Sequence, residues 1–193
     1  MTSEVAVVVL AGGEGSRIGG GKPLKHFGGE RLIDQALRRA QIWSDVVAVA
    51  VRDVGQVEPL PAPLIKDEDV PGPLGGLISG LLFARQKGLN FLLAIPADMP
   101  FLPDDLLDRL REKIGDKGCA LAESGGHIHP VCSLWRTHVM DDARVYAASG
   151  RRSLKGLAAF IGFAVAGWPA EPVDPFFNIN TSSDLAEAAR RKN

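Results

Sequence analysis

An uninterrupted apolar run near the start of the chain leads directly into a glycine-rich segment. Residues 5–10 are all apolar, and four of the six are valine, which predicts a β-strand buried on both faces. Six glycines lie between positions 12 and 21, and the only cations of the stretch are Arg17 and Lys22. Glycine lets backbone N–H groups approach an anion, and the two cations supply countercharge. The stretch therefore predicts a buried strand that carries a phosphate-binding loop at its end.

The rest of the chain alternates between apolar runs and segments with helical periodicity. Strands are expected at 46–51, 64–66, 91–95, 119–123, 130–135 and 163–166, and helices at 31–42, 77–87, 104–113, 137–148, 154–160 and from 181 onward. Residues 71–76 are interpreted as a glycine-rich turn. The alternation predicts an α/β fold of the Rossmann-like three-layer α/β/α kind, with a mostly parallel sheet in one domain. Strands 119–123 and 130–135 have no helix between them, so they are expected to form an antiparallel part.

Composition narrows the function classes. A chain of 193 residues with 46% hydrophobic and 23% charged residues suits one globular domain. With a net charge of −1, the chain has no excess of positive charge that would attract nucleic acid or an anionic membrane. The first apolar run is too short to span a bilayer and is not preceded by a basic segment, so no signal peptide is expected. Cys119 and Cys132 lie in apolar runs and are expected to be buried free thiols of a cytoplasmic protein.

The two commonest phosphate-binding motifs do not fit the glycine-rich segment. In a P-loop alignment, Ser16 takes the place of the first glycine, and Pro23 takes the place of the magnesium-binding hydroxyl. In a dinucleotide fingerprint, Ile18 takes the place of the last glycine. On glycine content alone, a phosphate site and a structural turn both remain open.

Asp98 favours the phosphate site. It lies between Ala97 and Met99 directly after the strand predicted at 91–95, where a carboxylate is costly without a partner. It could accept hydrogen bonds from a turn, or it could bind Mg²⁺, which one or two carboxylates and substrate phosphates typically hold. Ligands of such sheets bind beyond the carboxyl ends of strands. The glycine loop and Asp98 are therefore expected to face each other across one cleft, where a Mg²⁺–nucleoside triphosphate would fit.

At this point the sequence resembles a known family. The motif Leu10-Ala-Gly-Gly13, followed by Arg17 and Lys22, looks like the signature of nucleotidyltransferases that activate sugars and cofactors. Further matches make the chain similar to molybdenum cofactor guanylyltransferases from residue 10 to about 185. These matches are Asp67, Gly72-Pro-Leu-Gly-Gly76, Pro96-Ala-Asp-Met-Pro-Phe-Leu102, His129-Pro130 and Phe177-Asn-Ile-Asn-Thr181.

The resemblance implies a fold of the nucleotide-diphospho-sugar transferase type and transfer of GMP from GTP to the phosphate of molybdenum-bound molybdopterin. It implies that residues 1–115 bind GTP and Mg²⁺ and that residues 116–193 bind the acceptor, within one domain spanning 1–193. The implied GTP-binding residues are Leu10, Ala11, Gly12, Gly13, Arg17, Lys22, Asp67 and Asp98. Of these, Lys22, Arg17 and Asp98 would be catalytic, and Asp98 would hold the metal. The implied acceptor-binding residues are His129, Arg151, Arg152, Asn178 and Asn180.

Two features depart from the family pattern, and other functions remain open. The second strand ends without the asparagine that often contacts the nucleotide, and Lys22 follows a glycine where a carboxylate is common.

A cytidylyltransferase for the same cofactor often carries Leu-Ala-Ala-Gly, so the Leu-Ala-Gly-Gly motif favours GTP. Another small nucleotidyltransferase or a non-catalytic nucleotide-binding protein are further alternatives. Partner proteins would be molybdenum-insertion proteins and apo-molybdoenzymes.

Overall fold

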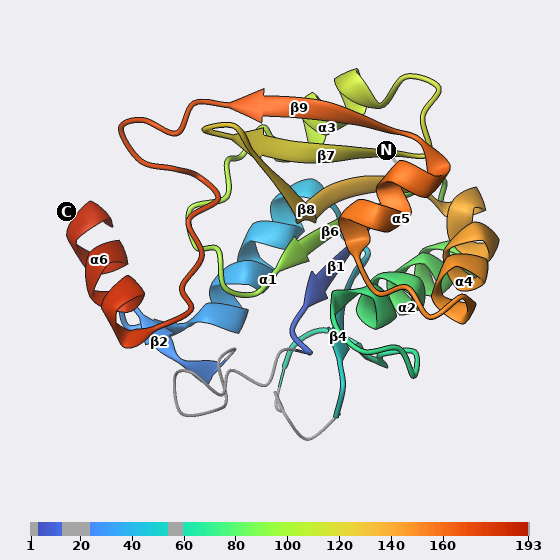
Figure 1. The fold of residues 1–193 in the computed structure, drawn as a ribbon. Coiled ribbons are helices and arrows are strands. Elements are labelled where there is room, and N and C mark those ends of the chain that lie inside the picture. Colours follow the sequence, from blue (N-terminus) through green and yellow to red (C-terminus); the bar gives the residue numbers. More distant parts are fainter. Residues whose placement is uncertain (1–3, 13–23, 54–59, 193) are drawn as a thin grey trace.

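The computed structural model describes residues 4–12, 24–53 and 60–192. Its centre is a seven-stranded sheet with the strand order β5-β4-β1-β6-β8-β7-β9 (Figure 1). The strands are β1 (Val5–Leu10), β4 (Val47–Val51), β5 (Leu64–Lys66), β6 (Phe91–Pro96), β7 (Cys119–Ser124), β8 (His127–Arg136) and β9 (Phe163–Trp168). The helices are α1 (Leu32–Trp43), α2 (Pro73–Gln86), α3 (Leu106–Ile114), the 3-10 helix η4 (Thr137–Val139), α4 (Met140–Ala148), α5 (Leu154–Ile161) and α6 (Ser182–Lys192).

The parallel half of the sheet is built around β1. This strand pairs in parallel with β4 on one side and with β6 on the other, and β4 pairs in parallel with β5. Val5 to Val9 are all buried, as expected for a strand covered by helices on both faces. The prediction of strand, helix and parallel strand at the start of the chain is confirmed.

The antiparallel part is confirmed, and it is inserted inside the sheet. β8 lies between β6 and β7 and is antiparallel to both, whereas β9 pairs in parallel with β7 at the sheet edge. The turn that joins β7 to β8 contains Gly125 and Gly126, whose φ angles of 55° and 81° lie in the left-handed region that favours glycine. A register shift after Leu121 makes this pairing irregular.

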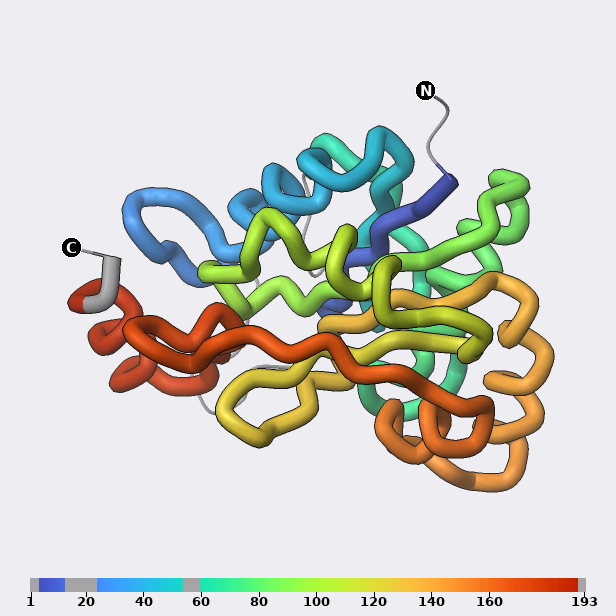
Figure 2. The backbone as a smooth tube through the Cα atoms, turned by 90° about the horizontal axis from the view of Figure 1, so that it is seen from above, coloured from blue at the N-terminus to red at the C-terminus, as the bar shows by residue number. Residues whose placement is uncertain are grey.

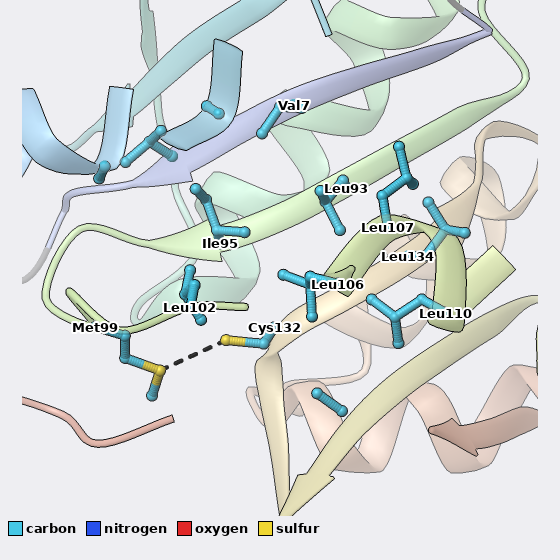
Figure 3. Close-up of a cluster of buried hydrophobic side chains, with 14 of the residues drawn as sticks. Val7, Leu93, Ile95, Met99, Leu102, Leu106, Leu107, Leu110, Cys132 and Leu134 are labelled. Atoms are coloured by element: carbon cyan, nitrogen blue, oxygen red, sulfur yellow. Dashed lines mark hydrogen bonds between the residues drawn. The ribbon is translucent and has the colours of Figure 1, made fainter. Parts of the chain in front are cut away.

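Helices cover both faces of the sheet, so the predicted three-layer arrangement is confirmed. Figure 2 shows α1 on the opposite side of the sheet from α4 and α5. Side chains of α1 and α3 pack on one face, where Ile33 and Leu37 of α1 are buried. Figure 3 shows Leu106 of α3 in the same cluster, near Leu93 of β6. Side chains of α2, α4 and α5 pack on the other face, where Leu77 and Leu157 are fully buried. Fully burying an aliphatic side chain of this size stabilises the fold by roughly 1.5–3 kcal/mol.

The prediction of a turn at residues 71–76 was wrong, because α2 already begins at Pro73. Gly72 precedes it with a φ of 80°, and proline suits the first helical position, where no N–H is needed. Gly75 is inside the first turns of the helix, and a Cβ there would lie 2.6 Å from the backbone oxygen of Val70 and 2.7 Å from that of Glu68. This glycine serves close packing against the preceding loop rather than a turn.

The C-terminal helix returns to the start of the chain. Thr181 Oγ1 accepts a hydrogen bond from the backbone N–H of Asp184, and the Asp184 carboxylate accepts one from the N–H of Thr181, which is the arrangement of a capping box. Figure 1 shows α6 beside β2 (His26–Phe27), which forms a small antiparallel pair with β3 (Glu30–Arg31). Ala188 of α6 and Phe27 of β2 belong to one buried cluster. Within the described ranges, no helix is long and apolar enough to cross a bilayer.

Candidate functional site

A cleft of about 210 Å³ opens where the parallel strands end. Its walls come from the residues after β1, β4, β5 and β6, from the N-terminus of α2, and from segments that follow much later in the chain. The described residues that line it are Leu10, Gly12, Ala50, Arg52, Asp67, Gly72, Pro73, Gly76, Pro96, Asp98, Val131 and Asn178. Ligands of parallel sheets bind at this end, beyond the carboxyl ends of the strands.

Asp67 lies where a negative charge is unfavourable. It follows β5, and its backbone N–H donates to the carbonyl oxygen of Val51 at 2.8 Å. Its Oδ1 is buried and has no hydrogen-bond partner in the described part of the chain. Burial raises the pKa of Asp67 to about 6, against the opposing effect of the Arg52 charge. A buried acceptor that the protein leaves unsatisfied is available for a donor on a ligand.

Two glycines from distant segments make room for the Asp67 carboxylate. A Cβ at Gly12 would overlap Oδ2 of Asp67. A Cβ at Gly76 would lie 3.1 Å from Oδ1 of Asp67 and 3.0 Å from a methyl carbon of Leu10. The carboxylate is therefore wedged between the end of β1 and the first turns of α2, where the positive end of the helix dipole favours a negative charge.

Asp98 lines the same cleft from the turn after β6. Its carbonyl oxygen accepts a hydrogen bond of 3.0 Å from the backbone N–H of Ile179, which brings the neighbouring Asn178 into the cleft. No group of three or more potential metal-binding His, Cys, Asp or Glu side chains occurs among the described residues. The donor set of this cleft suits a cation such as Mg²⁺, which needs only one or two carboxylates when a substrate supplies phosphate oxygens.

Arg52 lines the cleft although it was not among the predicted site residues. It directly follows β4, where the sequence lacks the expected asparagine. The signal that could have identified it is its position as the first polar residue after a buried strand, the same argument that identified Asp98. The end of β4 thus contributes a cation where an amide was expected.

Several predicted site residues are not among the described residues that line the cleft. Ala11 is buried, and its backbone N–H donates to the carbonyl oxygen of Ala50 at 2.9 Å. Asn180 is exposed at the start of the C-terminal helical segment, where its backbone N–H bonds to Asp184. Arg151 and Arg152 are exposed in the loop between α4 and α5, with the Arg151 guanidinium 5.5 Å from the ring centre of Tyr146.

His129 belongs to a separate polar network. The Ser124 hydroxyl donates to Oδ1 of Asp174 at 2.8 Å, which leaves its oxygen to accept from Nε2 of His129 at 2.8 Å. The His129 ring stacks on Phe176, with ring centres 4.7 Å apart. Burial lowers the pKa of His129, against the opposing effect of Asp174. This network joins the β7–β8 hairpin to the segment that carries Asn178.

The remaining predicted residues, Gly13, Arg17 and Lys22, lie outside the described residues.

The two cysteines are free and buried, as expected. Burial raises the pKa of the Cys119 thiol to about 12, and Cys132 contacts the sulfur of Met99 at 3.5 Å (Figure 3). Neither thiol is activated for chemistry at neutral pH.

Comparison with known proteins gives relatives of nearly the same length. A protein named molybdenum cofactor guanylyltransferase from Cereibacter sphaeroides is 38% identical over 183 residues, which cover 94% of this chain and 93% of the relative. A protein of the same name from Rhodopseudomonas palustris is 38% identical over 192 residues, which cover 95% of this chain and 91% of the relative.

Solved structures show the same fold. Molybdopterin-guanine dinucleotide biosynthesis protein A from Archaeoglobus fulgidus has a TM-score of 0.77 at 23% identity, covering 97% of this chain and 98% of that chain. CMP:2-keto-3-deoxy-manno-octonic acid synthetase, solved with CTP, has a TM-score of 0.72 at 16% identity, covering 97% and 98%. The sequence profile of one family, the MobA-like NTP transferase domain, matches residues 7–162. The chain therefore belongs to the family of MobA-like NTP transferase domains.

Proposed function

We propose that this protein is a nucleotidyltransferase that transfers GMP from GTP to the terminal phosphate of molybdenum-bound molybdopterin. The products are the guanine dinucleotide form of the cofactor and pyrophosphate. One observation carries the proposal: a chain 38% identical to molybdenum cofactor guanylyltransferases over nearly its full length has a cleft lined by Leu10, Gly12, Asp67 and Asp98. These are residues to which the family resemblance assigns GTP binding.

The reaction exchanges one phosphoanhydride bond for another. An oxygen of the molybdopterin phosphate forms a bond to the α-phosphorus of GTP, and the bond from that phosphorus to the bridging oxygen of the β-phosphate breaks. Pyrophosphate leaves with the electron pair of that bond. No nucleophilic side chain is required, so the protein's contribution is to orient the two substrates and to stabilise negative charge.

Within the cleft, we assign the guanosine end of GTP to Leu10, Ala11, Gly12 and Asp67. The unsatisfied Oδ1 of Asp67 supports this assignment, because an N–H or O–H of the nucleoside could satisfy it. Ala11 would contribute through the backbone on either side of it. We assign the triphosphate to Gly13, Arg17 and Lys22, on the basis of the sequence motif alone. Arg17 and Lys22 are the cations that would offset the developing charge.

Asp98 is the proposed ligand of a divalent cation, Mg²⁺. When bound, such an ion neutralises phosphate charge and polarises the bond between phosphorus and its oxygens. Asp98 would hold it from the turn after β6, which lies beside the end of β1. The carbonyl of Asp98 is fixed by the N–H of Ile179, so the turn that carries the carboxylate is tied to the segment expected to meet the acceptor.

The glycine at position 12, as part of the Leu10-Ala-Gly-Gly13 motif, favours GTP over CTP. A cytidylyltransferase of this type often carries alanine at the position of Gly12. Here, a methyl group at that position would overlap the Asp67 carboxylate. The glycine at position 12 therefore favours the guanylyltransferase over the cytidylyltransferase.

We assign acceptor binding to residues 116–193 and GTP binding to residues 1–115. Asn178 is the acceptor-side residue best supported by position, since it lines the cleft. His129 would act by anchoring the Asn178 segment, and Asn180, Arg151 and Arg152 are assigned from the resemblance.

The proposed location is the cytoplasm, with molybdenum-insertion proteins and apo-molybdoenzymes as partners.

The test is a transfer assay with molybdenum-bound molybdopterin, Mg²⁺ and either GTP or CTP. We expect formation of the guanine dinucleotide cofactor and release of pyrophosphate with GTP, and loss of both with Asp98→Asn. Preferential use of CTP would overturn the base assignment. Tight binding of GTP with no product from any molybdopterin acceptor would overturn the enzymatic proposal in favour of a binding protein.

A further inference from the structure

The hydroxyl of Ser79 joins α2 to the loop that carries Asp67. Ser79 lies within α2 and is 7% exposed. Its Oγ accepts a hydrogen bond of 2.9 Å from the backbone N–H of Glu68 and donates one of 2.8 Å to the backbone oxygen of Lys66. Lys66 and Glu68 are the two neighbours of Asp67. A single hydroxyl therefore holds the peptide groups on both sides of this residue.

This use of a serine is unusual for a helix interior. A serine there commonly bonds to the carbonyl oxygen of its own preceding turn, which weakens the helix slightly. Here both hydrogen bonds leave the helix and reach another segment. The hydroxyl is satisfied as donor and as acceptor, so removing it would leave the part-buried N–H of Glu68 and carbonyl of Lys66 without this partner.

Further contacts restrict the same loop. The N–H of Asp67 donates to the Val51 carbonyl at 2.8 Å, and the tight approach of Gly75 to the oxygens of Glu68 and Val70 leaves no space for the loop to move toward α2. With these constraints and the two Ser79 bonds, the backbone of Asp67 is held from the sheet side and from the helix side. The carboxylate is thereby kept between Gly12 and Gly76.

Ser79 is not among the described residues that line the cleft, whereas Asp67, which lies between the two residues that Ser79 bonds, does line it. We propose that Ser79 is a positioning residue that holds the Asp67 carboxylate in place for the guanosine end of GTP. This inference rests on the proposed function, in which Asp67 contacts GTP.

Ser44 provides a matched control. It is also buried, with 6% exposure, and its Oγ also bridges two backbone groups: it donates to the Val5 oxygen at 2.7 Å and accepts from the Val46 N–H at 3.0 Å. It lies at the end of the sheet opposite the cleft, where β1 and β4 begin. Ser44→Ala therefore removes the same kind of bridge without touching the cleft.

The experiment measures steady-state guanylyl transfer and Mg²⁺–GTP affinity for the wild type, Ser79→Ala, Ser44→Ala, Asp67→Asn and the double variant Ser79→Ala/Asp67→Asn. Measurements are made well below the unfolding temperature of each protein. For Ser79→Ala we expect the KM and Kd for GTP to rise about tenfold with kcat within about twofold, because a binding contact away from the reacting phosphorus is weakened. In the Asp67→Asn background, Ser79→Ala should change Kd by less than about twofold.

A merely structural role gives a different pattern. Partial unfolding lowers the active fraction, and hence kcat, without changing KM, and it should be similar for Ser44→Ala and Ser79→Ala. The inference is overturned if Ser79→Ala leaves Kd and KM at the wild-type values, or if it weakens binding equally with and without the Asp67 carboxylate. A wild-type protein that binds GTP but transfers nothing refutes the proposed function instead, while the Kd comparison still decides the role of Ser79.

Discussion

Replacing Asp67 with asparagine is expected to stabilise the ligand-free protein at neutral pH. The carboxylate is half-buried, and its Oδ1 has no hydrogen-bond partner among the described residues. Its pKa rises from 3.8 to about 6 on folding, chiefly because burial disfavours the charged form. Asparagine has nearly the same shape without the charge, so it removes the cost of burying the ion while keeping the packing between Gly12 and Gly76.

The size and sign of the effect follow from proton linkage. A rise in pKa from 3.8 to about 6 corresponds to about 3 kcal/mol for a carboxylate fully removed from water. Solvent screens part of that cost for a half-buried group, so we expect about 1–2 kcal/mol. Between these two pKa values the folded state binds more protons than the unfolded state, so the contribution of Asp67 to stability falls as pH rises. The loss is complete above about pH 6 and absent below about pH 4.

Urea unfolding from about pH 4 to about pH 8 tests this prediction. The free energy of unfolding of Asp67→Asn minus that of the wild type should grow by about 1–2 kcal/mol over this range, with unchanged m-values. Asp69→Asn, on the exposed part of the same loop, controls for the general effect of removing a negative charge. A difference that is independent of pH, or that shrinks as pH rises, would refute the account of a desolvated carboxylate.

Three further substitutions test the packing and caps described above. Gly12→Ala places a methyl group on Asp67 Oδ2; it should cost about 1–3 kcal/mol of stability in urea unfolding and weaken GTP binding in the same titration used for Ser79. Gly72→Ala meets no atom within 4 Å but forces alanine to a φ of 80°; urea unfolding should show a loss of about 1–2 kcal/mol with no clash to relieve. Thr181→Ala removes the cap of α6 and should lower stability by about 1 kcal/mol, measured the same way.

The sheet could be predicted well because the apolar runs leave few alternatives. A run such as Val5 to Leu10 has no polar face, so it must be covered on both sides, and helices in between require parallel neighbours. The start of α2 could not be predicted in this way. Glycine has low helix propensity, and only the structure shows that the oxygens of Glu68 and Val70 approach Gly75 too closely for a side chain.

The site was partly predictable. Residues directly after a buried strand can be placed by topology alone, which located Gly12 and Asp98 and could have located Arg52. The burial of Asp67 could not be deduced from sequence, since Asp67-Glu-Asp69 has the composition of a solvated acidic loop. The role that we propose for it rests on the family resemblance.

The position of His129 depends on an irregularity that the sequence does not reveal. The register of β7 and β8 shifts after Leu121, so that Ala122 pairs with His129. Pro130, the next residue, has no N–H to donate to the ladder. Near this irregularity, His129 bonds to Ser124 while Val131 lines the cleft. Strict alternation along the strand would not have separated these two side chains in that way.

The Asp67 carboxylate packs tightly between two glycines from other segments. The residues in these three segments are therefore expected to change together in evolution. Gly12 follows the first strand, Gly76 lies in α2, and Asp67 stands between them. A side chain at Gly12 would have to displace the end of the Asp67 side chain, and one at Gly76 would also meet Leu10 and Ala50. We therefore expect substitutions at positions 12, 67 and 76 to occur together among relatives. A redesign of base preference would accordingly have to change these positions as one unit.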